Sequence, residues 1–219
     1  IIYNKGIITS ESIVELLTID IDDIKSACYK SMSTSEIYNT LNLNGLSYGP
    51  AHQSIEEIYI GEKVVLAKLS IPDSIKNSQQ EYILHPTILD GALQSTFGLF
   101  HNHEIYNKDN NMPYVPFALK SLTVFSHCND MCWAYISFNK NNSTDSDIKK
   151  VDVQLFDLNG KILIEMNEFS SRSLKASKVT NNLAETKGTL LLSPLWEHSN
   201  KINMNLNRSF SYYFSIFCD

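Results

Sequence analysis

Residues 85–94, His-Pro-Thr-Ile-Leu-Asp-Gly-Ala-Leu-Gln, constrain the fold more than any other stretch of the chain. Proline suits the first position of a helix, where its missing N–H would have no partner within the helix. Pro86 therefore predicts that a helix begins there. Apolar residues then recur at steps of three and four, more densely than a helix with one solvent face needs; they are Ile88, Leu89, Ala92, Leu93 and Phe97. The pattern predicts one long, largely buried helix that runs to about Phe100.

A carboxyl group lies inside this apolar helix. Asp90 is followed one turn later by Gln94, on the same face. Burial of a carboxylate is unfavourable unless the group is paired or protonated. That unfavourable burial is the reason to suspect that Asp90 has a chemical role. Periodicity alone favours the alternative, a structural carboxylate that is bonded to backbone amides.

The rest of the chain carries strand and turn signals. Short runs of alternating or β-branched residues predict six strands, at residues 54–60, 63–71, 118–125, 131–138, 151–157 and 161–171. Asn159-Gly160 is a strong hairpin turn. Thr34 or Ser35 can cap a further helix that starts near Glu36. One long apolar helix among five or six antiparallel strands predicts an α+β fold, with the sheet wrapped around the helix.

Three ordered segments resemble one protein family. His-Pro-x-x-Leu-Asp-x-x-x-Gln at 85–94 resembles a signature of the dehydratase domains of polyketide synthases and animal-type fatty acid synthases. Gly-Leu-Ser-Tyr-Gly-Pro-Ala-His-Gln at 45–53 is similar to their Tyr-Gly-Pro segment, with His52 in place of the usual phenylalanine. Residues 151–153 and 157–160 are similar to their last hairpin. The resemblance spans about residues 36–175, implies the hot-dog fold, and reverses the preference for a structural Asp90.

The resemblance also implies a reaction, the removal of water from a 3-hydroxyacyl thioester. Asp90 would protonate the departing hydroxyl, because hydroxide is a poor leaving group, and Gln94 would assist it. The substrate would arrive on the phosphopantetheine of an acyl carrier protein, and the segment itself would bind no cofactor or metal. Four further residues are expected to contact substrate: Tyr48, Gly49, Pro50 and His85. A core aromatic at Tyr48 and a capping or packing role at the helix start for His85 are the simpler alternatives.

The family's base is missing from this chain. It is a histidine in a His-x-x-x-Gly-x-x-x-x-Pro motif of an upstream hot-dog unit, and none of the six histidines here has glycine four residues later. We therefore expect the second of two hot-dog units that share a site, inactive when alone. Its expected partners are the upstream half with the catalytic histidine, the carrier protein and a second copy of the parent synthase. A non-catalytic remnant that packs, dimerises or binds a carrier is the alternative. A third is a product-template or thioesterase hot dog, which the Asp-x-x-x-Gln spacing disfavours.

Composition sets the remaining bounds. A chain of 219 residues, 43% of them hydrophobic, predicts one core domain with flanking segments: a lead-in or inter-hot-dog linker at 1–35, the hot dog at 36–175, and a linker toward a following domain at 176–219. A net charge of −6 without a basic cluster argues against a nucleic-acid surface. The absence of a signal peptide or of an apolar run of about 20 residues predicts a cytoplasmic protein that does not enter a membrane. His-Asn-His-Glu at 101–104 lacks further ligands at a recognisable spacing, so no metal site is predicted.

Overall fold

The computed structural model describes residues 2–10, 17–100, 114–142, 148–173 and 212–217, which fall into two compact units. The smaller unit comprises Ile1–Val14 and Lys178–Asp219. In it, strand β1 (Ile2–Ile8) pairs antiparallel with strand β10 (Tyr212–Phe217). Most of the predicted linker at 176–219 lies outside the described residues. The larger unit, Glu15–Ser177, contains the predicted helix and sheet.

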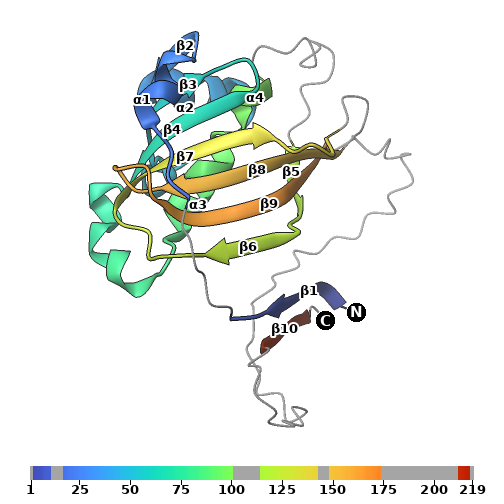
Figure 1. Ribbon diagram of the computed structural model, residues 1–219. Coiled ribbons are helices and arrows are strands. Elements are labelled where there is room, and N and C mark those ends of the chain that lie inside the picture. The colour runs from blue at the N-terminus through green and yellow to red at the C-terminus, as the bar shows by residue number, and fades with distance from the viewer. Residues whose placement is uncertain (1, 11–16, 101–113, 143–147, 174–211, 218–219) are drawn as a thin grey trace, which may run out of the picture. The chain divides into compact units, whose positions relative to one another are not determined.

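The larger unit is built on one antiparallel sheet, which is visible edge to edge in Figure 1. The strand order is β2-β3-β4-β7-β8-β9-β5, and β6 also pairs with β9. The strand predicted at 118–125 is the shorter strand β6, and β5, which ends at Ala118, was not predicted. The bounds are β2 (Lys30–Ser33), β3 (Ile55–Ile60), β4 (Val64–Ser70), β5 (Tyr114–Ala118), β6 (Ser121–Val124), β7 (Met131–Phe138), β8 (Ile148–Phe156) and β9 (Ile162–Ser173).

The predicted long helix is divided by a turn. Helix α3 (Pro86–Gln94) ends one residue before Ser95, and α4 (Phe97–Phe100) begins after Thr96. Both intervening hydroxyls bond back to helix carbonyls: Ser95 Oγ donates to Gly91 O at 2.7 Å, and Thr96 Oγ1 donates to Leu93 O at 2.7 Å. Such local bonds compete with the regular backbone ladder, which explains why the helix is interrupted here.

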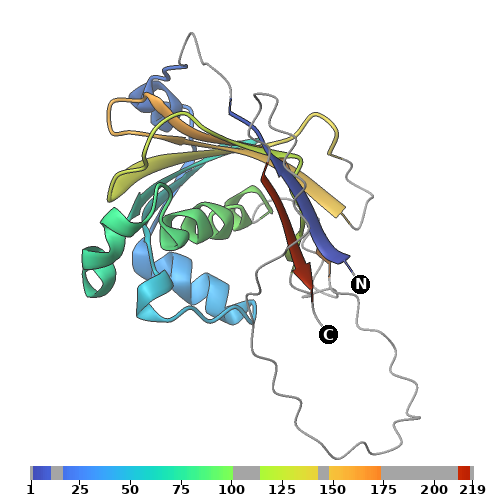
Figure 2. The ribbon, with the colours of Figure 1, turned by 90° about the horizontal axis from the view of Figure 1, so that it is seen from below.

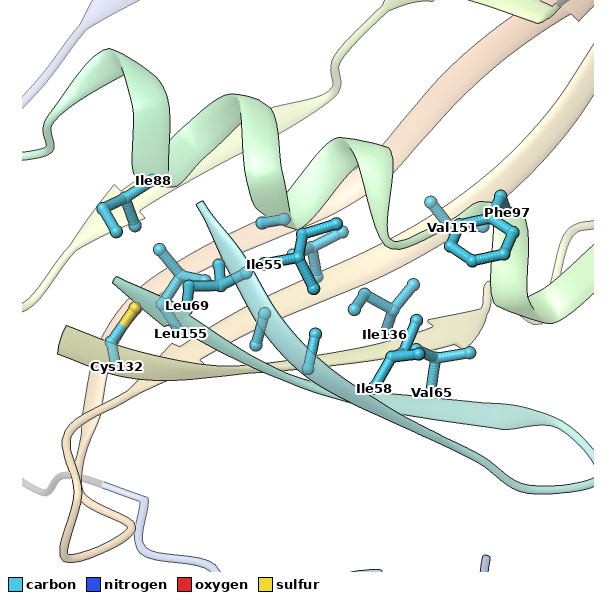
Figure 3. Packing of buried hydrophobic residues seen from close by; sticks show 14 of the residues in the cluster. Ile55, Ile58, Val65, Leu69, Ile88, Phe97, Cys132, Ile136, Val151 and Leu155 are labelled. Carbon is cyan, nitrogen blue, oxygen red and sulfur yellow. The ribbon is translucent and has the colours of Figure 1, made fainter. Parts of the chain in front are cut away.

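Apolar side chains of α3 face one side of the sheet. Figure 2 shows α3 lying along that face, with α2 (Thr34–Leu43) beside it. Ile88 and Ala92 of α3 are fully buried in this core. Alternate residues of the strands meet them, because successive strand side chains point to opposite faces. Figure 3 shows how side chains of the helix and strands interdigitate, and the labelled strand residues include Ile58, Val65, Leu69, Ile136 and Leu155.

The opposite face of the sheet carries a second, smaller cluster, formed by Leu66, Trp133, Phe156 and Ile162. Ile21 and Ile24 of helix α1 (Ile21–Ser26) pack against it. Residues that we expected in a lead-in at 1–35 therefore contribute both α1 and β2 to the folded unit. The pairing of β2 with β3 makes residues 30–33 a strand, and no local pattern in that segment indicated it.

The described part of the larger unit also contains two 3₁₀ helices. Helix η1 (Pro50–His52) comes directly after the Tyr-Gly pair of the Tyr-Gly-Pro segment, and η2 (Asp73–Glu81) precedes α3. Helix α2 begins after Ser33, whose backbone N–H bonds the Glu36 carboxylate at 2.8 Å in a capping box, so its cap lies one or two residues before the predicted one. None of the described helices is long and apolar enough to span a membrane.

Candidate functional site

Helix α3 is held at its start by His85. The His85 Nδ1 accepts a hydrogen bond from the Thr87 backbone N–H at 3.2 Å, which is an N-cap, and its Nε2 lies 3.0 Å from Ser78 Oγ. The residue is 5% exposed. Burial lowers the pKa of His85, nearby Glu81 opposes that shift, and His52 adds to it. The structure thus gives His85, predicted as a substrate contact, a neutral ring with its proton on Nε2.

Asp90 lies one turn into α3 and belongs to a polar network. Gln94 Nε2 donates to Asp90 Oδ2 at 2.8 Å and also to the His52 backbone carbonyl at 2.9 Å. His52 Nδ1 is 3.1 Å from the same Asp90 Oδ2. The Asp90 side chain is 38% exposed. The wholly apolar surroundings that we expected are therefore wrong: the carboxyl stands at the edge of the core, paired with two nitrogen groups.

The segment after α2 brings His52 to this network. Gly45 adopts φ +81°, in the left-handed region that glycine occupies without strain, and ends α2. Gly49 then forms the N-cap of η1 and Pro50 its first residue. Thr87 Oγ1 donates to Ala51 O at 3.0 Å and ties η1 to α3. Gly49 and Pro50 thus shape the approach of His52 to Asp90.

A pocket of about 150 Å³ opens beside Asp90. Tyr48 and Gln94 line it together with Asp90, whereas Gly49, Pro50 and His85 are not among its lining residues. Most of the remaining wall is apolar and comes from α2, α3, α4 and the strands; it includes Leu41, Leu46, Leu93, Phe97, Phe100, Tyr114 and Phe169. The structure therefore brings three predicted site residues to one mostly apolar pocket.

Two tyrosines flank the carboxyl. The rings of Tyr38 and Tyr48 meet edge to face, with centroids 6.3 Å apart. Burial raises the pKa of Tyr38 to about 12, and the negative charge of Asp90 adds to that rise. Burial and Asp90 also raise the pKa of Tyr48. Both phenols consequently stay protonated at neutral pH. The Tyr38 hydroxyl accepts from the Ile55 backbone N–H at 3.1 Å and lies 3.5 Å from the His52 carbonyl, to which it donates.

Gln94 has a second, unusual feature. The residue is 5% exposed, and its Oε1 is buried without a hydrogen-bond partner among the described residues. Its amide nitrogen faces two acceptors, Asp90 Oδ2 and His52 O. A flipped amide would set its oxygen against both, so the orientation is determined by the network.

Chemically, the site offers one carboxyl with two polar neighbours at a mostly apolar pocket. Among the described residues, no group of three or more His, Cys, Asp or Glu side chains is placed to hold a metal ion. The His-Asn-His-Glu segment at 101–104 lies outside the described residues.

The residue that sequence reasoning passed over is His52. It was not predicted as a site residue, although its imidazole reaches the carboxyl of Asp90. The available signal was its departure from the usual phenylalanine in a segment that otherwise matched the dehydratase pattern.

Comparisons with known proteins agree with this geometry. Residues 19–181 match the family model described as "Polyketide synthase dehydratase N-terminal domain". Polyketide synthase PksN of Bacillus subtilis (strain 168) is 32% identical over 222 residues, covering 100% of this chain and 4% of that protein. The chain thus spans a small part of the curated relatives it matches.

Solved structures show the same architecture. A trans-AT PKS dehydratase domain from Brevibacillus brevis superimposes with a TM-score of 0.68 and 35% identity, over 75% of this chain and 56% of that one. The dehydratase domain from the CurJ module of curacin polyketide synthase gives a TM-score of 0.63 at 29% identity, over 74% and 55%. These likenesses confirm the predicted α+β hot-dog fold. Because this family model matches most of the chain, residues 19–181, the chain belongs to the polyketide synthase dehydratase family.

Proposed function

We propose that this chain is the C-terminal half of a polyketide synthase dehydratase domain, in which Asp90 donates the proton that turns a departing hydroxyl into water. The observation that carries the proposal is the placement of the Asp90 carboxyl. Its Oδ2 is bonded by Gln94, and the group lies in the wall of a mostly apolar pocket together with Tyr48. A carboxyl so placed can meet the polar centre of a substrate whose acyl chain fills the pocket.

The reaction needs an acid and a base. The base removes a proton from the carbon next to the thioester carbonyl, the bond from carbon 3 to its hydroxyl oxygen breaks, and the proton of Asp90 passes to that oxygen. Water leaves, a carbon–carbon double bond remains, and Asp90 is left as a carboxylate. The N–H of Gln94 stabilises that charge. The substrate would be presented on the phosphopantetheine of an acyl carrier protein, at the mouth lined by Tyr48.

The base is assigned to an upstream hot-dog half. The chain spans 56% of the solved Brevibacillus brevis dehydratase, so a single dehydratase has room for a second unit of similar size. One structure of the CurJ dehydratase is described as an inactive mutant with phenylalanine in place of a histidine. The description of the family model refers to an N-terminal domain. The Asp-x-x-x-Gln signature nevertheless supports the second half, because the histidine motif of the first is absent from this sequence.

The alternative is a non-catalytic hot-dog unit that packs, dimerises or binds a carrier protein. The missing histidine motif favours this role for the chain alone. The two proposals predict different outcomes when the upstream half is supplied, since only a catalytic half then gains activity.

Dehydration of a carrier-bound 3-hydroxyacyl thioester, monitored by mass spectrometry as loss of water, tests the proposal. We expect no turnover by the chain alone and turnover when the upstream half is joined to it. Asp90→Asn should then lower kcat by about 10²–10⁴-fold, the usual contribution of a general acid. Asp22→Asn is the matched control, because the Asp22 side chain is 94% exposed and remote from the pocket. Turnover by the isolated chain, or full activity of Asp90→Asn, contradicts the proposal.

A further inference from the structure

We propose that His52 is a positioning residue for Asp90: its Nδ1–H and the Nε2–H of Gln94 together hold Oδ2 of the carboxyl, which leaves Oδ1 to carry the proton and hand it over. The inference rests on the proposed function and assigns a role to a residue that the dehydratase signature does not contain. Its basis is the pair of contacts at one oxygen, 2.8 Å from Gln94 Nε2 and 3.1 Å from His52 Nδ1.

The two oxygens of Asp90 are not equivalent. An amide N–H can only donate, so Oδ2 accepts a hydrogen bond from Gln94. With Oδ2 already accepting, a neutral imidazole is best accommodated with its proton on Nδ1, as a second donor to the same atom. A carboxyl proton then belongs on Oδ1. Because Gln94 restrains Oδ2, the carboxyl is not free to exchange its two oxygens.

The backbone holds the His52 ring in this position. The His52 carbonyl accepts from Gln94 Nε2 at 2.9 Å, and Ala51 O accepts from Thr87 Oγ1 at 3.0 Å. Both bonds join η1 to α3, so ring and carboxyl move as one unit. The side chain is 53% exposed on its other side.

Other titratable groups around the pair come from α2, α3, η2 and the loop between α2 and η1. Tyr38 of α2 and Tyr48 of the loop between α2 and η1 both sense the charge of Asp90. His85 at the start of α3 senses His52, and Glu81 of η2 faces His85. Neither tyrosine carries a charge at neutral pH, because burial raises the pKa of both phenols. The two contacts at Asp90 Oδ2 therefore come from the amide of Gln94 and the ring of His52.

The consequence is that the carboxylate formed in the reaction is stabilised where it forms. When the proton leaves Oδ1, the negative charge spreads over both oxygens, and two donors stabilise it at Oδ2. Hydrogen bonds to a charged group are stronger than those to a neutral one, so the benefit grows as the proton departs. Phenylalanine, the usual residue at position 52, supplies no such donor. We expect His52→Phe to lower kcat about ten- to a hundredfold with KM little changed.

The first test reads the tautomer of His52 in the purified chain, without any activity. Nitrogen-15 NMR of labelled histidines at mildly alkaline pH distinguishes Nδ1–H from Nε2–H. We expect Nδ1–H at His52, Nε2–H at the capping residue His85, and a mixture at exposed His127. Asp90→Ala should convert His52 to the mixed pattern and leave His85 unchanged. Nε2–H at His52 in the wild type, or no response to Asp90→Ala, overturns the inference.

The second test uses the chain joined to its upstream half. His52→Asn keeps an N–H donor close to the place of Nδ1, whereas His52→Phe keeps only a ring. We expect Asn to restore most of the kcat that Phe loses, while urea unfolding shows both variants folded. A His52→Phe enzyme with wild-type kcat, or an Asn variant as slow as Phe, refutes the role. Because the NMR result does not depend on turnover, a failure of the proposed function would be recognised separately.

Discussion

Gly91→Ala should destabilise the fold, although alanine is the better helix former. Gly91 comes directly after the catalytic candidate Asp90 in α3 and faces the start of β3. A Cβ built at Gly91 would overlap Ser54 Oγ, and would lie 3.3 Å from Ser54 Cβ and 3.4 Å from Leu69 Cδ2. Ser54 is 1% exposed, and its hydroxyl donates to Thr87 O at 3.0 Å. The hydroxyl would have to turn away and lose that partner inside the core.

The magnitude combines three effects. A buried hydroxyl without a partner costs about 1–3 kcal/mol, and overpacking against Ser54 Cβ and Leu69 adds about 1–3 kcal/mol. The greater helix propensity of alanine returns about 1 kcal/mol. We therefore expect Gly91→Ala to lower the free energy of unfolding by roughly 3 kcal/mol.

Urea unfolding of the wild type, Gly91→Ala, Ser54→Ala and the double variant measures this in one cycle. Removing the Ser54 hydroxyl relieves the overlap, so Gly91→Ala should be nearly neutral in the Ser54→Ala background. We expect a coupling energy of at least about 1 kcal/mol between the two sites, as is usual for residues in contact. A Gly91→Ala protein as stable as the wild type, or additive effects in the double variant, would refute the close packing of α3 on β3.

Three further predictions concern stability. Burial lowers the pKa of His85, so the stability from its neutral ring is complete above the unfolded pKa of about 6.5 and declines as pH falls below it. His85→Asn keeps a cap acceptor and should lose less stability than the wild type between about pH 7.5 and 5.5 in urea titrations. An unchanged dependence of the unfolding free energy on pH would contradict this. Lys120 and Lys150 hold the pKa of Glu168 at about 2, so its contribution to stability is present above the ordinary pKa of 4.5 and is lost as pH falls toward 2. Glu168→Gln should therefore weaken the fall of the melting temperature with decreasing pH in this range. The same fall in the variant and the wild type would argue against the ion pairs. Gly160→Ala should cost more than Gly45→Ala: both glycines have φ near +80°, but only at Gly160 would a Cβ overlap the carbonyl of Ile19. We expect about 1 kcal/mol at Gly45 and at least about 2 at Gly160, and equal losses would refute the difference.

Local sequence signals predicted most of the elements of the larger unit. Strand β7 (Met131–Phe138) has its predicted bounds, and α3 begins at Pro86 as predicted. Alternation within a strand and the special geometry of proline act over a few residues, so they can be recognised without the fold. The prediction failed where a distant partner decides. Residues 30–33 become β2 by pairing with β3, and residues 114–118 become β5 by pairing with β9.

The candidate site divides in the same way. Asp90 and Gln94 had to share a face of α3, because residues four apart on a helix are neighbours, and the sequence alone determined that pair. Their surroundings were decided by tertiary structure. His52 is 38 residues from Asp90 along the chain, and only the packing of η1 on α3 brings its imidazole within 3.1 Å of the carboxyl. The 38% exposure of Asp90 likewise depends on which groups the folded chain places around it, since helical periodicity defines a direction and not the neighbours found there.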